Sequence, residues 1–180
     1  MRRLAYMGLV AALGLPTSAG ATTSSRAAVT STVTATGQSL PPLGTAAWSR
    51  IRGGGRLAVK LRNLPGVATT ATGQWTGTQP VRGGYLHTGV ETELLCDQAV
   101  KVEVRVRLEA REDGHWVTQL DIGLPVTCDV DPTMYYVTHY RLTSDEQWHG
   151  ATAVPVRTTV WVPITNVAAA VRGTVDAYGT

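Results

Sequence analysis

Residues 50–62 carry five cationic side chains around three consecutive glycines. The glycines predict the tip of a β-hairpin, and cations alternate with apolar residues on the strand after it. The glycine run lacks the Gly-Lys-Ser/Thr ending of a phosphate-binding loop, which argues against nucleotide binding. Cations on one solvated sheet face suit an anionic partner, such as an acidic polysaccharide, a cell-wall polyanion or an acidic protein surface. The predicted anion-binding residues are Arg50, Arg52, Arg56, Lys60 and Arg62. The alternative is an ordinary charged sheet face whose cations pair with the acids of residues 91–131.

Two tryptophans form a second candidate binding surface. Trp161 alternates with Val160 and Val162, so we expect its ring to point outward. Trp75 lies in the Gly- and Thr-rich segment 65–84, which is predicted to be a long mobile loop or a weak edge strand. Exposed rings stack on sugars or anchor protein interfaces. The alternative is that both rings are buried at sheet ends and under loops.

No group of residues predicts catalysis or metal binding. Glu91 and Glu93 place two carboxylates roughly 7 Å apart on one strand face, within reach of a glycosidase pair, but a solvated edge explains them equally. Residues 144–149 contain Ser, Asp and His, yet the members of a catalytic triad normally come from separate elements. Asp129 and Asp131 could offer oxygens to calcium but lack a full ligand set. We therefore predict no catalytic residue, no metal and no cofactor.

The elements that must position these residues are β-strands. Valine and threonine are abundant, and apolar residues recur at every second position, as in residues 100–110. About nine such segments, separated by Gly-, Pro- and Thr-rich turns, predict an all-β protein. The expected architecture is an antiparallel β-sandwich, Ig-like or jelly-roll-like, and a closed β-barrel is the second choice.

Residues 100–126 predict a hairpin whose opposed residue numbers sum to 226, with a three-residue loop at residues 112–114. Cys96 and Cys128 lie just beyond its two ends and differ from that register by two residues, which a bulge near Gly123 or Pro125 would absorb. Since these are the two cysteines of an exported chain, we predict a Cys96–Cys128 disulfide.

Export itself is predicted from residues 1–21, which combine Arg2 and Arg3, an apolar run of 12 residues and a small-residue end. The run is too short to span a bilayer. Residues 22–180 are then a single domain with a loose leader at residues 22–28. Removing the signal peptide lowers the formal net charge from +3 to +1. Residues 22–90 hold seven cations and no acid, whereas residues 91–131 have a net charge of −6.

These observations predict a secreted or cell-surface-associated, non-catalytic binding module. Its partner would be a protein or polysaccharide outside the cell, not nucleic acid, and no segment is predicted to cross a membrane. One alternative is a self-assembling coat protein, in which basic and acidic regions of successive copies pair, so a homo-oligomer stays open. A protease inhibitor that uses segment 65–84 as its reactive loop is another alternative, and a hydrolase is the last.

Overall fold

The computed structural model describes residues 30–36, 43–128, 131 and 133–180. Within these residues the chain forms ten strands and no helix. The strands are β1 (Thr30–Thr36), β2 (Gly44–Ile51), β3 (Gly54–Arg62), β4 (Ala68–Arg82), β5 (Tyr85–Cys96), β6 (Val100–Glu112), β7 (His115–Cys128), β8 (Tyr136–Thr143), β9 (Ala153–Thr165) and β10 (Ala170–Gly179). The predicted signal peptide and leader, residues 1–28, lie outside the described residues. In the described part of the chain, no helix has the length and apolarity needed to span a bilayer.

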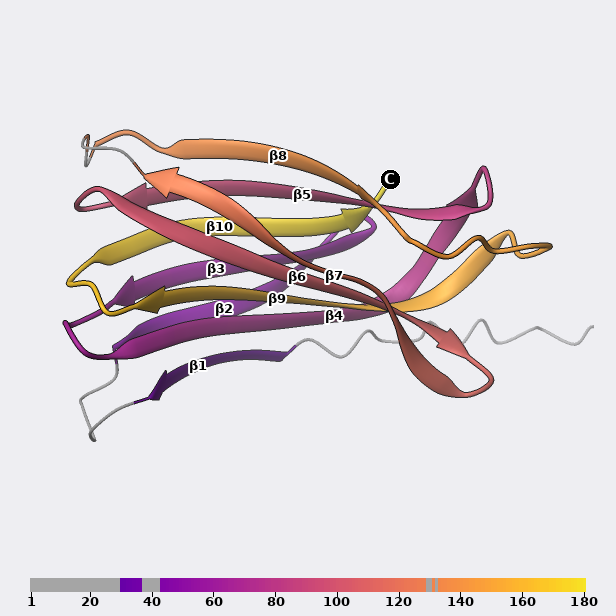
Figure 1. Cartoon of the computed structure of the whole chain (residues 1–180), viewed down its shortest axis with the longest axis horizontal. Helices are drawn as coiled ribbons and strands as arrows, with labels where there is room; N and C mark the ends of the chain where they lie inside the picture. The colour runs from indigo at the N-terminus through magenta and orange to yellow at the C-terminus, as the bar shows by residue number, and fades with distance from the viewer. Residues whose placement is uncertain (1–29, 37–42, 129–130, 132) are drawn as a thin grey trace, which may run out of the picture.

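The strands form two antiparallel sheets that lie one over the other (Figure 1). The first sheet has the order β2-β3-β10-β5-β8, and the second has the order β1-β4-β9-β6-β7. A short pairing between the end of β4 and the start of β5, with Val81 opposite Leu86, joins the two sheets. The outermost strands of the two sheets do not pair with one another, so the sheets stay open. The predicted all-β antiparallel sandwich is confirmed in preference to the closed barrel.

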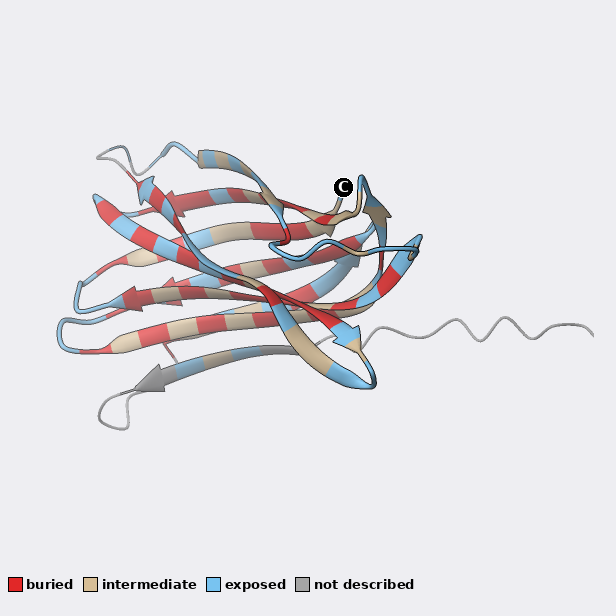
Figure 2. Ribbon diagram, turned by 45° about the vertical axis from the view of Figure 1, so that its right-hand side comes forward, coloured by how far each residue is buried: buried red, intermediate tan, exposed pale blue. Residues whose placement is uncertain are grey.

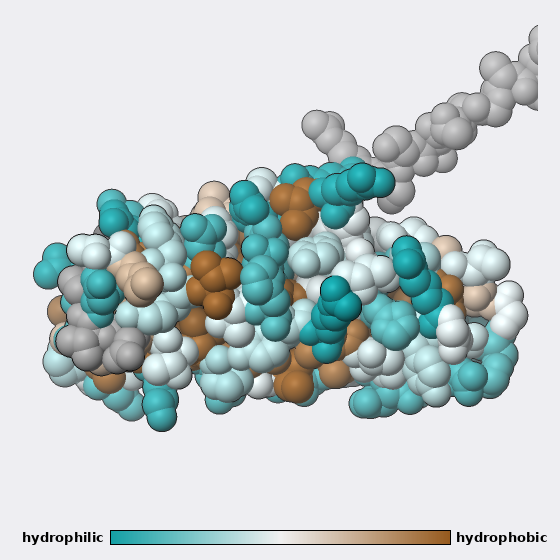
Figure 3. Space-filling view, turned by 90° about the horizontal axis from the view of Figure 1, so that it is seen from above, coloured by the Kyte–Doolittle hydropathy of each residue, from teal (hydrophilic) through white to brown (hydrophobic). Residues whose placement is uncertain are grey.

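The core lies between the two sheets and follows from the alternation of side chains along each strand (Figure 2). On β6 the valines at even positions are buried, while Lys101, Glu103 and Arg105 point outward. The largest apolar side chains that are completely buried are Leu57, Leu61, Leu86, Leu94, Leu108, Val90, Val102, Val104, Val106, Val126 and Val156. On the face seen in Figure 3, hydrophobic side chains appear in small groups among hydrophilic ones. Removing the inner faces from water therefore supplies the main stabilising free energy of this fold.

Residues 68–82, expected in a mobile loop or weak edge strand, form the 15-residue strand β4. This strand pairs with β9 on one side and with β1 on the other, so it is an inner strand of the second sheet. Its glycines make room for aromatic rings, since an added Cβ at Gly73 would collide with Trp48, and one at Gly77 with Trp75. The prediction of a mobile loop or a weak edge strand is therefore wrong for residues 68–82. At Gly73 and Gly77 the space that a side chain would take is filled by the rings of Trp48 and Trp75.

The β6–β7 hairpin has a different register from the predicted one. The opposed residue numbers sum to 228 up to Leu108 and to 227 from Glu109 to the tip, not to 226. The register shift lies between these two residues rather than near Gly123 or Pro125. The loop is the pair Asp113-Gly114, with φ of 45° and 86°, which is the left-handed geometry that two-residue hairpins prefer. Because 228 is even, like 226, the apolar side chains still share one face over most of the hairpin.

The predicted disulfide between Cys96 and Cys128 is present, and the two Cα atoms are 6.0 Å apart. Cys96 ends β5 in the first sheet, whereas Cys128 ends β7 in the second sheet. The bond therefore fastens one sheet to the other. It does not close the ends of one hairpin, as the sequence positions had indicated.

Candidate functional site

The five cations predicted to bind an anion do not form one cluster. Arg56, Lys60 and Arg62 point outward from β3, as the alternation predicted. Arg50 and Arg52 lie beside the β2–β3 turn. Because β3 has nine residues and a strand rises about 3.3 Å per residue, the two ends of the hairpin are roughly 26 Å apart. One group of cations, Arg50 and Arg52, therefore lies at the turn, and the other, Lys60 and Arg62, lies at the far end of β3.

Arg56 lies between these groups and is neutralised within the fold. Its guanidinium donates two hydrogen bonds of 2.7 Å to the carboxylate of Asp176 on β10. The hydrogen bond and the charge of Asp176 raise the pKa of Arg56, and the charges of Glu93 and Glu91 add to this effect. The partner of Arg56 is therefore an acid outside residues 91–131. This ion pair leaves Arg56 poorly suited to an external anion.

Lys60 and Arg62 instead border a cleft of about 680 Å³ with Arg172, at the end of the first sheet where β3 finishes and β10 begins. We call this the cationic cleft. Its lining also includes the apolar side chains of Leu43 and Leu95. Leu95 belongs to the outward-facing row of β5 because it lies opposite Arg172, yet it is only 5% exposed. The cleft therefore joins an apolar floor to cationic walls.

Like charges meet directly in the cationic cleft. Lys60 and Arg172 are opposed across the β3–β10 pairing, and Arg62 follows on the same face of β3. Within the described residues none of the three makes an ion pair. One acid, Asp97, also lines the cleft, and its carboxylate accepts a hydrogen bond of 2.7 Å from the Ala170 backbone N–H. Directly opposed like charges destabilise a sheet, so an anion placed between them would relieve a cost built into the fold.

Arg172 and Leu95 were not among the residues predicted from the sequence. The pair Leu94-Leu95 within one strand was a usable signal, because successive side chains point to opposite faces and one leucine must therefore face outward. Arg172 alternates with Val171 in the same way. Nothing in this local pattern shows that β10 lies beside β3.

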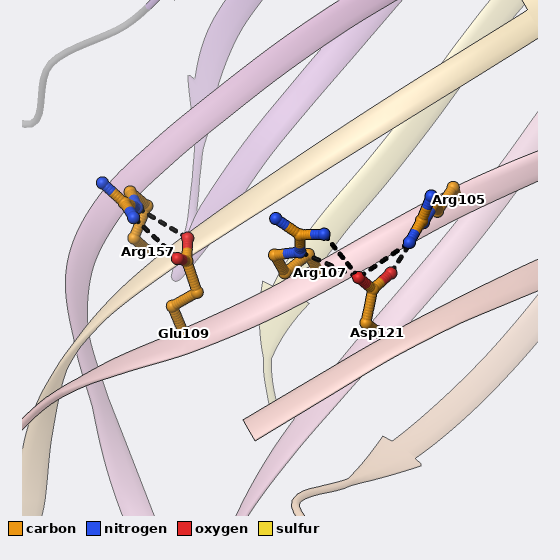
Figure 4. Close-up of polar contacts among 5 residues, drawn as sticks. All are labelled: Arg105, Arg107, Glu109, Asp121 and Arg157. Carbon is orange, nitrogen blue, oxygen red and sulfur yellow. Dashed lines mark hydrogen bonds and ion pairs between the residues drawn. The ribbon is translucent and has the colours of Figure 1, made fainter. Parts of the chain in front are cut away.

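Trp161 points outward from β9 on the second sheet, as predicted, but its ring is partly covered. The guanidinium carbons of Arg105 and Arg107 lie 5.9 Å and 5.5 Å from the ring centroid. Both guanidiniums also donate hydrogen bonds of 2.6–2.9 Å to the carboxylate of Asp121 (Figure 4). Asp121 thus offsets one of the two positive charges beside Trp161 and occupies hydrogen-bond donors of both guanidiniums, so this surface offers an anion less than the cationic cleft does.

The charge of Asp121 is held by these two guanidiniums. Its pKa is lowered, first by the hydrogen bond from Arg105 and then by the hydrogen bond and charge of Arg107, which outweigh its partial burial. The pKa of Arg105 is raised for the reciprocal reason. The carboxylate therefore stays ionised at neutral and mildly acidic pH, where it keeps both guanidiniums beside the ring.

The structure does not place Trp75 on the predicted aromatic surface. This tryptophan lies on β4, faces the core and is only 3% exposed. Residues 68–82 of segment 65–84 form β4, and Trp75 pairs with Thr158 of β9, so Trp75 is not presented on a loop. The structure therefore leaves Trp161 as the outward-facing member of the predicted pair.

The residues that were considered for catalysis, among them Glu91 and Ser144, make contacts within the sheets. Glu91 lies opposite His139 on β8, with 3.6 Å between Oε2 and Nδ1. The hydroxyl of Ser144 accepts a hydrogen bond from the Leu86 backbone N–H and donates one to the Glu146 carbonyl. In the described residues no three His, Cys, Asp or Glu side chains are grouped to hold a metal ion.

No model of a known protein family matches the chain, and no curated protein sequence matches it. Several solved structures have some similarity to it. One is the carbohydrate-binding module CBM28, specific for non-crystalline cellulose, with 13% identity, coverage of 74% of this chain and 78% of that chain, and a TM-score of 0.42. Another is the family 11 carbohydrate-binding module of a cellulosomal cellulase of Clostridium thermocellum, with 6% identity, coverage of 86% and 88%, and a TM-score of 0.37. Tailspike protein 4 of bacteriophage CBA120 has 12% identity and a TM-score of 0.41, and the match covers 87% of this chain but 20% of that chain. These identities are too low to infer a shared ligand, so function is argued from the residues of this chain.

Proposed function

We propose that this protein is an exported, non-catalytic binding module whose cationic cleft holds an acidic polysaccharide. One observation carries the proposal: Lys60 and Arg172 are directly opposed without an ion pair, beside Arg62 and above the apolar side chain of Leu95. Guanidinium and ammonium groups bind carboxylates through charge-assisted hydrogen bonds. The apolar floor suits the C–H face of a sugar ring, which a small inorganic anion lacks.

The charge around the cleft favours a carboxylated sugar chain over nucleic acid. Two positions along β10 from Arg172, the outer face of the first sheet becomes acidic, because Thr174 lies opposite Glu93 and, two positions further on, Asp176 lies opposite Glu91. A polyphosphate lying along the strands would be repelled there, since nucleic-acid binding depends on many cations along its path. The cleft therefore suits a chain that crosses the end of the sheet and places a few carboxylates among the three cations.

Two features support a location outside the cell. The predicted signal peptide at residues 1–21 would direct export, and the Cys96–Cys128 disulfide is the kind of bond that persists in oxidising compartments. The alternative of a protease inhibitor is not supported, because the segment that would serve as its reactive loop forms the inner strand β4. Self-assembly would appear as concentration-dependent sedimentation that decreases with salt.

The experiment compares two double variants that each remove one lysine and one arginine. Lys60→Ser/Arg172→Ser changes the cleft, whereas Lys101→Ser/Arg141→Ser removes the same charge from exposed positions on β6 and β8. Binding to polygalacturonate and to uncharged dextran is measured by calorimetry at low and at physiological salt. We expect the cleft variant to bind polygalacturonate at least about tenfold more weakly, which corresponds to about 1.4 kcal/mol, while the control retains binding. Equal losses in the two variants, or equal binding to dextran, would contradict the proposal.

A further inference from the structure

A second cleft is lined by residues of the β2–β3 turn, β4, β9 and the β6–β7 hairpin. The β2–β3 turn lies at the end of the sandwich opposite the cationic cleft, on the right in Figure 1. The volume of this second cleft is about 510 Å³, within the range of small-molecule sites. We call it the end cleft. Its lining residues are Arg50, Gly53, Gly54, Trp75, Thr76, Gly77, Thr78, Arg111, Trp116 and Pro155.

Two cations from different sheets border the end cleft. Arg50 comes from the first sheet, beside the β2–β3 turn, and Arg111 comes from β6 of the second sheet. Both are exposed, and within the described residues neither forms an ion pair or donates a side-chain hydrogen bond. Arg50, which the sequence grouped with Lys60 and Arg62, therefore belongs to a different site. Two free guanidiniums facing one cavity favour an anionic ligand.

The aromatic wall of the end cleft is held in place by an ion pair outside it. Arg157 on β9 stacks on Trp116, with its guanidinium carbon 4.9 Å from the ring centroid. Glu109 binds the same guanidinium through two hydrogen bonds of 2.6 Å (Figure 4). Glu109 is buried and Arg157 is partly buried. The hydrogen bond to Glu109 raises the pKa of Arg157, which fixes the stacked cation further. Trp116 is thus preoriented before a ligand arrives, which lowers the entropic cost of binding.

One residue that lines this cavity, Trp75, carries a buried donor without a partner. Among the described residues the indole N–H of Trp75 has no hydrogen-bond acceptor. The ring edge that carries this nitrogen packs against Gly77, which itself lines the end cleft. An unsatisfied buried donor costs about 1–3 kcal/mol, and unpaired ones cluster where a ligand or water completes the bond.

We propose that the end cleft binds a carboxylate attached to a planar or sugar ring. The carboxylate would lie between Arg50 and Arg111, and the ring would pack against Trp116. Such a ligand is either a free ring acid or the terminal acidic residue of a glycan. This site is separate from the cationic cleft, which lies at the other end of β3, so it does not depend on the function proposed there.

The test follows the indole N–H resonances of the protein by NMR during titration with two probes, benzoate and galacturonate. Benzamide and methyl galacturonate serve as their uncharged controls. Trp116→Phe identifies the resonance of that ring. We expect at least one acid to give a saturable shift of the Trp116 resonance and its uncharged control to give none. A response to benzoate alone assigns the site to free aromatic acids, and a response to galacturonate assigns it to acidic sugars.

Variants separate the end cleft from the cationic cleft. Arg50→Gln/Arg111→Gln is expected to weaken the response at least tenfold, whereas Lys101→Gln/Arg141→Gln, which removes two exposed cations from β6 and β8 outside the cleft, leaves it unchanged. The Lys60→Ser/Arg172→Ser variant is also expected to leave it unchanged, so the two sites fail independently. The absence of a saturable shift with either acid overturns the inference, and so does an equal response in the Arg50→Gln/Arg111→Gln variant.

Discussion

Replacing Lys60 by glutamate is expected to stabilise the fold and to abolish anion binding at the same time. In the native sheet Lys60 is opposed by Arg172, so the substitution exchanges a like-charged cross-strand pair for an oppositely charged one. Each such pair is worth about 0.2–1 kcal/mol in one direction or the other. The unfolding free energy should therefore rise by about 1 kcal/mol, which raises Tm by roughly 2–4 °C for a chain of this size.

The assay is thermal and denaturant unfolding at low and at physiological salt. Because the side chains are exposed, the gain should shrink as the Debye length falls from about 30 Å at 0.01 M to about 8 Å at 0.15 M. The neutral variant Lys60→Gln is the matched control, since it removes the repulsion without adding an attraction, and its stability should lie between the other two. Polygalacturonate should raise Tm of the native protein and not that of Lys60→Glu.

Two results would refute this reasoning. If Lys60→Glu is less stable than Lys60→Gln at low salt, the side chains at positions 60 and 172 do not act on one another. If Lys60→Glu binds polygalacturonate as well as the native protein does, the cationic cleft is not the anion site. Stability and binding are measured on the same samples, so a misfolded variant is distinguished from a correctly folded one that no longer binds.

Three further predictions concern the fold around these sites. The Cys96→Ser/Cys128→Ser variant should lose about 3–4 kcal/mol of unfolding free energy in chemical denaturation, as expected for opening a loop of this length, and a loss under about 1 kcal/mol would show that the bond adds little. Gly73→Ala should lower the unfolding free energy by about 1–3 kcal/mol and change the near-UV circular dichroism, because its Cβ would displace the Trp48 ring; unchanged spectra and stability would contradict this packing. Asp121→Asn should cost about 0.5–1 kcal/mol at neutral pH. Because the pKa of Asp121 is lower in the folded than in the unfolded protein, its contribution is present above the unfolded value and is lost as the pH falls through the folded value. The native protein and Asp121→Asn should therefore converge in stability in acid, and a constant difference across pH would contradict this assignment.

The parts of the fold that the sequence predicted correctly are those encoded by neighbouring residues. The valines of β6 and the cations of β3 alternate with side chains of the opposite character, and this period alone indicates which side chains face the core. The disulfide followed from the presence of two cysteines in a chain with a predicted export signal. The outward direction of Trp161 followed from Val160 and Val162 on either side of it.

The predictions that failed depended on packing between distant segments. Segment 65–84 has the Gly and Thr content of a loop, but residues 68–82 pair with the distant strands β1 and β9, and Trp48 from β2 packs on Gly73. The predicted register of β6 and β7 was wrong for two reasons: the loop has two residues instead of three, and the shift between Leu108 and Glu109 adds one more residue without a mark in the alternation.

The sequence by itself determined the strands, their inner and outer faces and the uneven distribution of charge along the chain. Only the tertiary structure decided where those charges meet. Lys60 is brought opposite Arg172, Arg56 is neutralised by Asp176, and the end cleft joins cations from both sheets. The physical reason is that a strand's period depends on local sterics and burial, whereas its neighbour and register depend on contacts between residues far apart in the chain. A cation on an outer face is therefore readable from the sequence, but whether it meets an acid, another cation or a cavity is settled by strand order.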